Sequence, residues 1–339
     1  MTILVLCPAR PGSRQGNRVT ALRWARILRR LGHRVAVRHA PGRSRPDLVI
    51  ALHARKSGAA ALRVQSRHGT TPLIVALTGT DVYRDIHRSR VARRVLDAAT
   101  RIVVLQSLAV RELRRGLRAK ARVIHQSASA VHVPRRRTWT FDVCVIGHLR
   151  AEKDPFRAAL AMRHLPADSA IRLLHVGRAM TPAMARRARA EMRRNARYRW
   201  LGERPGGATR ALLARSRAMV LSSRLEGGAN VVSEAVVSGV PVVASRIPGS
   251  VGLLGPDYPG YFPVGATRAL AAVLRRMECA PAFYARLARA CRRRAHLFAP
   301  AAEQRAWASL LREVAPGPRA TRLSGSSPGG CSAGDPRGR

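Results

Sequence analysis

Several features that are typical of membrane, secreted or metal-binding proteins are scarce or missing in this sequence. Aromatic residues make up 4% of the 339 residues, and the five cysteines form no C-x-x-C pair. No run of about 18 apolar residues occurs, so we expect no membrane-spanning helix. The amino terminus MTILVLCPAR lacks a basic start and a cleavable apolar core, so we expect no signal peptide. Together these absences predict a soluble, reduced, cytoplasmic protein.

Acidic residues are also few. Only 18 Asp and Glu stand against 63 Lys and Arg, and the formal net charge is +45. Such a charge would suit a protein that binds nucleic acid through counterion release. The arginines, however, are spread along nearly every predicted helix, and no zinc-finger, RRM or KH pattern appears. We expect most of them to face solvent, and we keep a basic nucleic-acid-binding protein as an alternative function class.

Lysine is the rarest cation in the chain. Only Lys56, Lys120 and Lys153 are present. In a chain this rich in arginine, a lysine indicates a site that needs a compact ammonium group rather than a planar guanidinium.

The order of the predicted elements divides the chain into two similar halves. Predicted strands lie at 2–6, 34–38, 47–52, 72–77, 101–105 and 122–124 in the first half and at 141–146, 171–176, 218–221 and 240–244 in the second. Helical segments between and after them, including 19–31 and 281–297, predict two parallel sheets of the α/β class. We place the domains at 1–134 and 135–300, with a linker at 135–138. Residues 316–339 are rich in Pro, Gly, Ser and Arg and predict a disordered tail.

The segment 218–244, AMVLSSRLEGGANVVSEAVVSGVPVVA, is the most informative part of the chain. It predicts a strand, a glycine turn, a helix at 230–237 and a second strand. Gly227 and Gly228 would let the backbone approach a bound group, which the amides of the first helical turn would face. Glu226 and Glu234 flank these amides, and carboxylates accept hydrogen bonds from vicinal hydroxyls. An anion site between two hydroxyl acceptors suits a nucleoside diphosphate sugar.

This segment resembles the E-x7-E signature of family-4-type glycosyltransferases, because Glu226 and Glu234 are followed by Gly239 and Pro241. The alternative is that two glutamates merely decorate an amphipathic helix, but the glycine turn and both strands favour the signature. The resemblance implies the GT-B fold, with two Rossmann-like domains that face each other across a cleft. It implies an acceptor domain at 1–134, a donor domain at 135–300 and a helix at 301–315 that returns to the first domain.

The same resemblance implies the donor-binding residues. Glu226 would meet the transferred sugar, and Glu234 the ribose hydroxyls. A second motif, Gly-Arg-Leu-x-x-x-Lys in the family, places Lys153 on the diphosphate, while His148 stands at the arginine position and leaves Arg150 as the alternative. The segment 199–204 resembles the one that contacts uracil. The remaining implied donor-binding residues are Gly147, Arg204, Gly227, Gly228, Ala229, Asn230 and Val231.

Polar residues follow two predicted strands of the first half. His53 comes directly after one strand and Asp81 closes a Thr-Gly-Thr-Asp run after another. Strand carboxyl ends line ligand clefts in parallel sheets. A structural histidine and a helix-capping aspartate are the competing interpretations. We expect His53, Asp81, Lys153 and Glu226 to be catalytic. The expected acceptor-binding residues are Gly16, Asn17, Thr20, Lys56, Thr78, Gly79, Thr80 and Arg84, and the loops also supply Arg10, Arg14, Arg18 and Arg55.

A narrower resemblance concerns the acceptor. The segments 18–24, 53–57, 77–86 and 147–150 are similar to those of the selenosugar synthases of the selenoneine pathway. That likeness implies transfer of a hexose or N-acetylhexosamine from a UDP-sugar, UDP-GlcNAc or UDP-glucose, to selenophosphate, with formation of a C–Se bond and a selenosugar. No Asp-x-Asp motif is present, so we expect no metal and no cofactor. An ordinary family-4 glycosyltransferase with a lipid or envelope saccharide acceptor is the alternative, and only then do we expect membrane contact.

Overall fold

The structure is a computed structural model that describes residues 1–13, 15–131, 133 and 140–314. The expected linker at 135–138, the expected tail at 316–339 and the loop residue Arg14 lie outside the described residues. Within the described ranges, no helix is both long and apolar enough to cross a membrane.

The first half is built on a six-stranded parallel sheet in the order β2-β1-β3-β4-β5-β6. Its strands are β1 (Thr2–Leu6), β2 (Arg34–Arg38), β3 (Leu48–Leu52), β4 (Leu73–Leu77), β5 (Arg101–Val104) and β6 (Ala121–Val123). Its helical segments are α1 (Gly16–Arg30), α2 (Ala54–Arg67), η1 (Asp81–Asp85), α3 (Ile86–Arg88), α4 (Arg90–Ala98), η2 (Ser107–Glu112) and α5 (Arg115–Arg118). β3 and β4 are apolar and buried at every position because helices cover both faces of such a sheet.

The second half repeats this plan with the strand order β12-β11-β10-β7-β8-β9. Its strands are β7 (Phe141–Ile146), β8 (Ile171–Val176), β9 (Tyr198–Trp200), β10 (Ala218–Leu221), β11 (Val242–Ser245) and β12 (Tyr261–Phe262). Its helical segments are η3 (Ala151–Lys153), α6 (Arg157–Met162), α7 (Pro182–Arg194), α8 (Gly206–Arg215), α9 (Asn230–Val237), α10 (Pro248–Leu254), α11 (Thr267–Cys279), α12 (Pro281–Arg294) and η4 (Ala295–Phe298). The prediction of two Rossmann-like α/β halves is confirmed.

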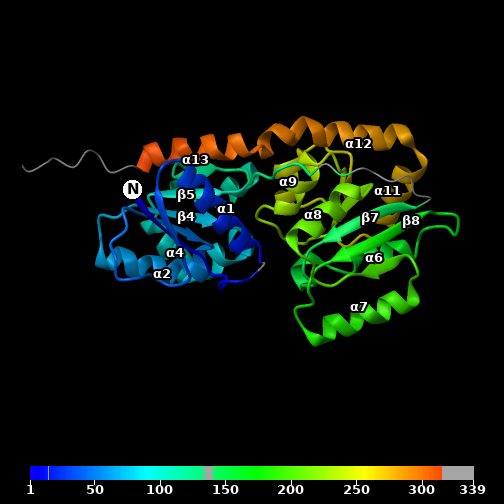
Figure 1. Ribbon diagram of the computed structural model, residues 1–339, viewed down its shortest axis with the longest axis horizontal. Coiled ribbons are helices and arrows are strands. Elements are labelled where there is room, and N and C mark those ends of the chain that lie inside the picture. The colour runs from blue at the N-terminus through cyan, green and yellow to red at the C-terminus, as the bar shows by residue number, and fades with distance from the viewer. Residues whose placement is uncertain (14, 132, 134–139, 315–339) are drawn as a thin grey trace, which may run out of the picture.

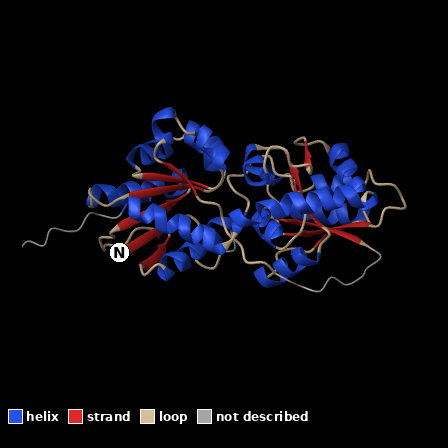
Figure 2. Cartoon of the chain, turned by 90° about the horizontal axis from the view of Figure 1, so that it is seen from above, coloured by secondary structure: helices blue, strands red, loops and turns tan. Residues whose placement is uncertain are grey.

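The last helix, α13 (Pro300–Val314), packs on the first half beside α1. Figure 1 shows it as the continuation of α12 along one side of both halves, and Figure 2 shows the two sheets end to end beneath it. The rings of Trp24 and Trp307 are fully buried and meet edge to face, with centroids 4.8 Å apart. The halves also touch where Gly252 of α10 packs against Gln106.

Three expected boundaries differ from the observed ones for local reasons. α1 begins at Gly16, three residues before the expected start, because Gln15 is extended and the helical hydrogen bonds begin with its carbonyl. β11 begins at Val242 rather than Val240, since Pro241 has no N–H for the ladder. The helix expected to reach residue 297 ends at Arg294 and tightens into η4.

The Trp24–Trp307 contact predicts how much α13 contributes to stability. Replacing Trp307 with alanine should lower the free energy of unfolding by about 3–5 kcal/mol, because a fully buried aromatic ring leaves a cavity. Trp307→Phe should cost less, since the buried Nε1 of Trp307 has no hydrogen-bond partner among the described residues. Denaturant unfolding measures both. The exposed Arg305→Ala on the same helix is the control, and an equal loss there would contradict the prediction.

Candidate functional site

The site is a cavity of about 510 Å³ between the two halves. Its walls are the segments that follow β1, β3, β4 and β6 in the first half and β7, β8, β9 and β10 in the second. In each case the loop leaves the carboxyl end of a parallel strand, where such sheets place ligands. All the residues expected to be catalytic line this cavity except Asp81, which lies directly behind its wall.

Glu226 lies at the centre of the second-half wall. The residue is 8% exposed, and its carboxylate accepts a hydrogen bond from Ser223 Oγ at 2.7 Å. The same Oε1 also pairs with the ammonium of Lys153, which closes the short helix η3. The loop after β10 is tied down by Ser222 Oγ, which donates to the carbonyls of Lys153 at 3.2 Å and Asp154 at 3.0 Å. Two residues 73 positions apart therefore form one charged pair.

Gly227 and Gly228 are required by close packing and not by an unusual φ. A Cβ at Gly227 would lie 2.8 Å from the amide nitrogen of Gly79, and one at Gly228 would lie 2.5 Å from Leu105 Cβ. Both neighbours belong to the first half. The sequence argument assigned the lack of side chains here to a bound group, whereas the structure shows that it also admits the facing domain.

The helix α9 follows this loop, and Glu234 lies on its cavity side. Burial raises the pKa of the Glu234 carboxyl above its ordinary value, and the charges of Arg210 and Arg23 oppose the shift. The other expected donor-binding residues of this loop, Gly228 and 229–231, also line the cavity, but Gly227 does not. Gly227 instead packs against the backbone of the facing domain.

The resemblance implies that the loop after β7 binds the diphosphate, and the sequence left open whether His148 or Arg150 is the cation beside Lys153. His148 Nδ1 accepts a hydrogen bond from the amide of Arg178 at 3.1 Å, and burial lowers the pKa of the His148 ring. His148 is therefore neutral near pH 7. Arg150 lines the same wall with its Nη1 3.3 Å from Glu152, so the geometry favours Arg150 as the cation beside Lys153. Gly147 and Arg204 complete this wall.

His53 is held in a strained conformation in the first-half wall. It has φ of 70°, which is rare for a residue with a side chain, and it is 2% exposed. Burial lowers the pKa of its ring, so the ring is neutral near pH 7. Its Nδ1 faces the amide of Lys56 at 3.4 Å, and its Nε2 has no hydrogen-bond partner in the described part of the chain.

Asp81 is a capping residue, although not of the helix that follows it. Its fully buried carboxylate accepts hydrogen bonds from the amides of Ala54 at 3.0 Å and Gly79 at 2.8 Å, so it holds the start of α2 and the loop after β4 together. Its Oδ2 lies 3.7 Å from His53 Nδ1. The sequence left helix capping as one interpretation of Asp81. In the structure Asp81 caps α2, which follows the neighbouring strand β3, and not the helical turn that follows Asp81 itself.

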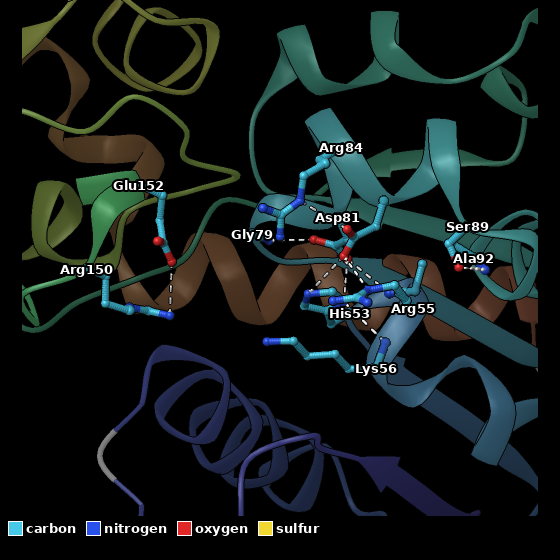
Figure 3. A network of polar contacts seen from close by, with 12 residues as sticks. His53, Arg55, Lys56, Gly79, Asp81, Arg84, Ser89, Ala92, Arg150 and Glu152 are labelled. Atoms are coloured by element: carbon cyan, nitrogen blue, oxygen red, sulfur yellow. Dashed lines mark hydrogen bonds and ion pairs between the residues drawn. The ribbon is translucent and has the colours of Figure 1, made fainter. Parts of the chain in front are cut away.

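Asp85, which sequence reasoning missed, organises the cations of this wall. It contacts Arg55 Nε at 3.0 Å and Arg84 Nε at 3.3 Å, and its Oδ2 is 3.7 Å from His53 Nε2. The π-helical turn Asp81–Asp85 places both aspartates on the buried side. Figure 3 shows this group, with the Lys56 side chain extending away from it.

The remaining residues expected to bind the acceptor gather in the same cavity. They are Gly16, Asn17, Thr20, Lys56, Thr78, Gly79, Thr80 and Arg84. Lys56 Nζ makes no hydrogen bond or ion pair with the described residues, unlike Lys120 and Lys153. In the ranges that the structure covers, no three His, Cys, Asp or Glu side chains are grouped to hold a metal.

A second set that the sequence did not reveal lies where the halves meet. Glu303 of α13 is 1% exposed and accepts hydrogen bonds from Trp24 Nε1 at 2.7 Å and from the amide of Ser127 at 2.9 Å. It also pairs with Arg23 Nε at 3.0 Å, and Arg23 Nη1 donates to Asn230 Oδ1 at 2.8 Å. No local pattern marks Glu303, since its partners are far away in sequence.

Comparison with known proteins finds a family match in the second half of the chain. Residues 134–294 match the family described as glycosyl transferases group 1, so the second half contains a domain of this family. The described part of the chain has the GT-B fold, which confirms the fold expected from the resemblance. Nothing in these comparisons addresses the narrower likeness to selenosugar synthases.

Solved structures share this fold at low sequence identity. Sucrose-phosphate synthase from Thermosynechococcus elongatus is 17% identical, with a TM-score of 0.76 over 92% of this chain and 98% of that one. HepE of Anabaena in complex with UDP-glucose is 17% identical, with a TM-score of 0.74 over 92% and 99%. A glycosyltransferase from Rickettsia africae is 13% identical, with a TM-score of 0.72 over 92% and 98%.

The raised pKa of Glu234 generates a prediction about pH. If Glu234 binds the ribose hydroxyls of UDP, as the resemblance implies, UDP affinity should fall as the pH drops through this raised pKa, because only the ionised carboxylate accepts hydrogen bonds with both oxygens. Because the pKa in the folded state lies above that in the unfolded state, ionisation of Glu234 opposes folding at higher pH and its protonation favours folding. Glu234→Gln should weaken UDP binding about tenfold at neutral pH and remove this acid-side dependence. Calorimetric titration between pH 4.5 and 7.5 would contradict the assignment if the variant kept the wild-type profile.

Proposed function

We propose that the protein transfers a hexose or N-acetylhexosamine from a UDP-sugar to selenophosphate. The observation that carries the proposal is the cavity itself, where the Lys153–Glu226 pair and the α9 amides face the first-half cations. The group 1 glycosyl transferase domain supports the transferase class, and HepE, a structural neighbour, is known in complex with UDP-glucose. Because of this domain, we conclude in favour of a sugar transferase over a nucleic-acid-binding protein.

In the proposed donor complex the second half binds UDP-sugar. Lys153 and Arg150 meet the diphosphate together with the amides of residues 228–231 at the start of α9, where the helix dipole favours an anion. Glu234 accepts hydrogen bonds from the ribose hydroxyls. The diphosphate takes the place of Glu226 beside Lys153, and the freed Glu226 carboxylate accepts from the sugar hydroxyls.

In the proposed acceptor complex the first half holds a second anion. Two unit charges about 5 Å apart repel by about 3 kcal/mol at an effective dielectric constant of 20, so the acceptor requires cations of its own. Lys56 supplies an ammonium with no other partner in the described residues, and Asp85 orients Arg55 and Arg84 nearby. A neutral saccharide acceptor would have no use for this group.

The proposed reaction has two balanced steps. A selenium lone pair attacks the anomeric carbon while the bond from that carbon to the diphosphate oxygen breaks, and UDP leaves with the electron pair. Selenophosphate is already an anion near neutral pH, so no strong general base is needed. Water then attacks phosphorus, the Se–P bond breaks, and inorganic phosphate and the protonated selenosugar remain. The neutral His53, whose Nε2 has no hydrogen-bond partner among the residues that the structure describes, and Asp81 behind it would position the phosphoryl group. We expect no metal in either step.

The acceptor assignment predicts a lysine-specific defect. Lys56→Met should lower kcat/KM for selenophosphate by about a hundredfold, because the loss of one charged group that faces a transferring anion costs about 2.7 kcal/mol. UDP affinity should stay within about twofold, since Lys56 lies in the other half. UDP release from UDP-GlcNAc or UDP-glucose with selenophosphate measures the first effect, and calorimetry measures the second.

The matched control is Lys120→Met, because Lys120 donates to the carbonyl of Asp97 far from the cavity lining. Thiophosphate and water serve as alternative acceptors. UDP release from the wild type that selenophosphate does not raise above either control would remove the selenium acceptor while leaving the transferase domain intact.

A lipid or envelope saccharide acceptor is the second candidate. The observation in its favour is that Val19 and Leu22 are each 42% exposed on α1, and Val19 lines the cavity. An apolar pair beside basic residues would suit the surface of an anionic membrane. Sedimentation with vesicles containing phosphatidylserine, together with turnover that depends on them, would favour this acceptor over selenophosphate.

A further inference from the structure

The loop 227–230 leads into the first turn of α9. Residues of the first half pack directly against its two glycines. A Cβ at Gly227 would lie within 3.0 Å of the backbone of residues 78–79, and one at Gly228 would lie 2.5 Å from Leu105. These contacts leave no room for the loop to move toward the first half. They limit its position without fixing the direction of its peptide groups.

Hydrogen bonds from the first half fix that direction. The side-chain amide of Gln126 is oriented so that its nitrogen faces acceptors and its oxygen faces donors. In this orientation the nitrogen donates to the Gly228 carbonyl and to Asn230 Oδ1, each at 3.0 Å. The Gln126 oxygen accepts from Arg23 Nη2 at 3.1 Å and from Thr20 Oγ1 at 2.6 Å. Arg23 Nη1 donates to Asn230 Oδ1 at 2.8 Å. One glutamine and one arginine therefore hold a backbone carbonyl and a side chain of the opposite half.

Glu303 anchors this pair from the far side. Its Oε2 lies 3.0 Å from Arg23 Nε and accepts from Ser127 Oγ at 2.5 Å. Arg23, Gln126 and Glu303, which we call the clasp, thus connect α13 through α1 to the loop 227–230. Arg23 also lies near enough to Glu234 for its charge to favour the ionised carboxyl.

The composition of the clasp argues against a role in stability alone. Gln126 and Glu303 are 3% and 1% exposed, and buried polar groups of this kind are often no more stabilising than apolar side chains of the same size. A fully connected polar network instead selects one geometry. Its two ends lie on different halves, so all its hydrogen bonds can form together only in one relative orientation of the halves.

We propose that the clasp positions the amides of residues 228–231 for the donor diphosphate, so that Arg23, Gln126 and Glu303 are positioning residues that couple domain closure to donor binding. This inference rests on the proposed function for the donor role of that loop. Arg23 and Gln126 contact the loop through Gly228 and Asn230, and Glu303 acts through Arg23.

Two conservative variants test the inference in the full chain. Arg23→Lys keeps the positive charge beside Glu303 and Glu234 but cannot reach both Asn230 and Gln126. Gln126→Met keeps the volume and loses both donors. Each should raise the Kd for UDP about tenfold, and the double variant should stay within about twofold of either single one because both act on the same loop. Amide hydrogen exchange of residues 228–232 should accelerate about tenfold without ligand.

The control is Arg26→Lys, the same substitution at an exposed position on α1 with no contact to the loop. The thermal midpoint of each variant should stay within a few degrees of wild type, since only a few buried hydrogen bonds change. Variants with the wild-type UDP Kd and unchanged exchange at 228–232 would overturn the clasp alone. A wild type with no UDP affinity would overturn the proposed function as well, and an Arg26→Lys defect as large as that of Arg23→Lys would also count against the clasp.

Discussion

The structure depends on one geometric constraint: the carboxyl ends of the strands in two parallel sheets face each other across a narrow gap. Because each strand ends at the gap, its next residues enter the cavity, and so His53, Thr78, Gly147 and Glu226 converge from four different strands. The gap is narrow only because Gly227 and Gly228 have no side chains. The sheets supply rigidity, and the loops supply the chemistry.

Much of this could be predicted from local patterns. Continuous apolar runs marked the strands, and the spacing of Glu226 and Glu234 around a glycine turn marked the loop that enters the cavity, because both features lie within one strand–loop–helix unit. The scarcity of lysine drew attention to three residues, of which Lys56 and Lys153 line the cavity and Lys120 does not. Boundaries failed where a single residue decided them, as at Pro241, whose missing N–H delays β11.

Contacts between distant elements could not be predicted. Glu303 and Arg23 are 280 residues apart, and their pairing depends on how α13 returns across the first half. Asp85 gained its role only because a π-helical turn directs it toward Arg55 from the neighbouring strand's helix. The capping target of Asp81 was missed for the same reason, since its partner Ala54 belongs to another strand–helix unit. Spacing along the chain describes one element, while these contacts join two or three.

The charges in the cavity also explain why the net charge of +45 is a poor guide to the site. Most cations that line the cavity are already matched by one of the few carboxylates of the chain: Lys153 by Glu226, Arg150 by Glu152, and both Arg55 and Arg84 by Asp85. A matched cation is held in one direction, which an unmatched surface arginine is not, and orientation is what a preorganised anion site requires. The scarce acidic residues, and not the abundant basic ones, therefore define where an anion would bind.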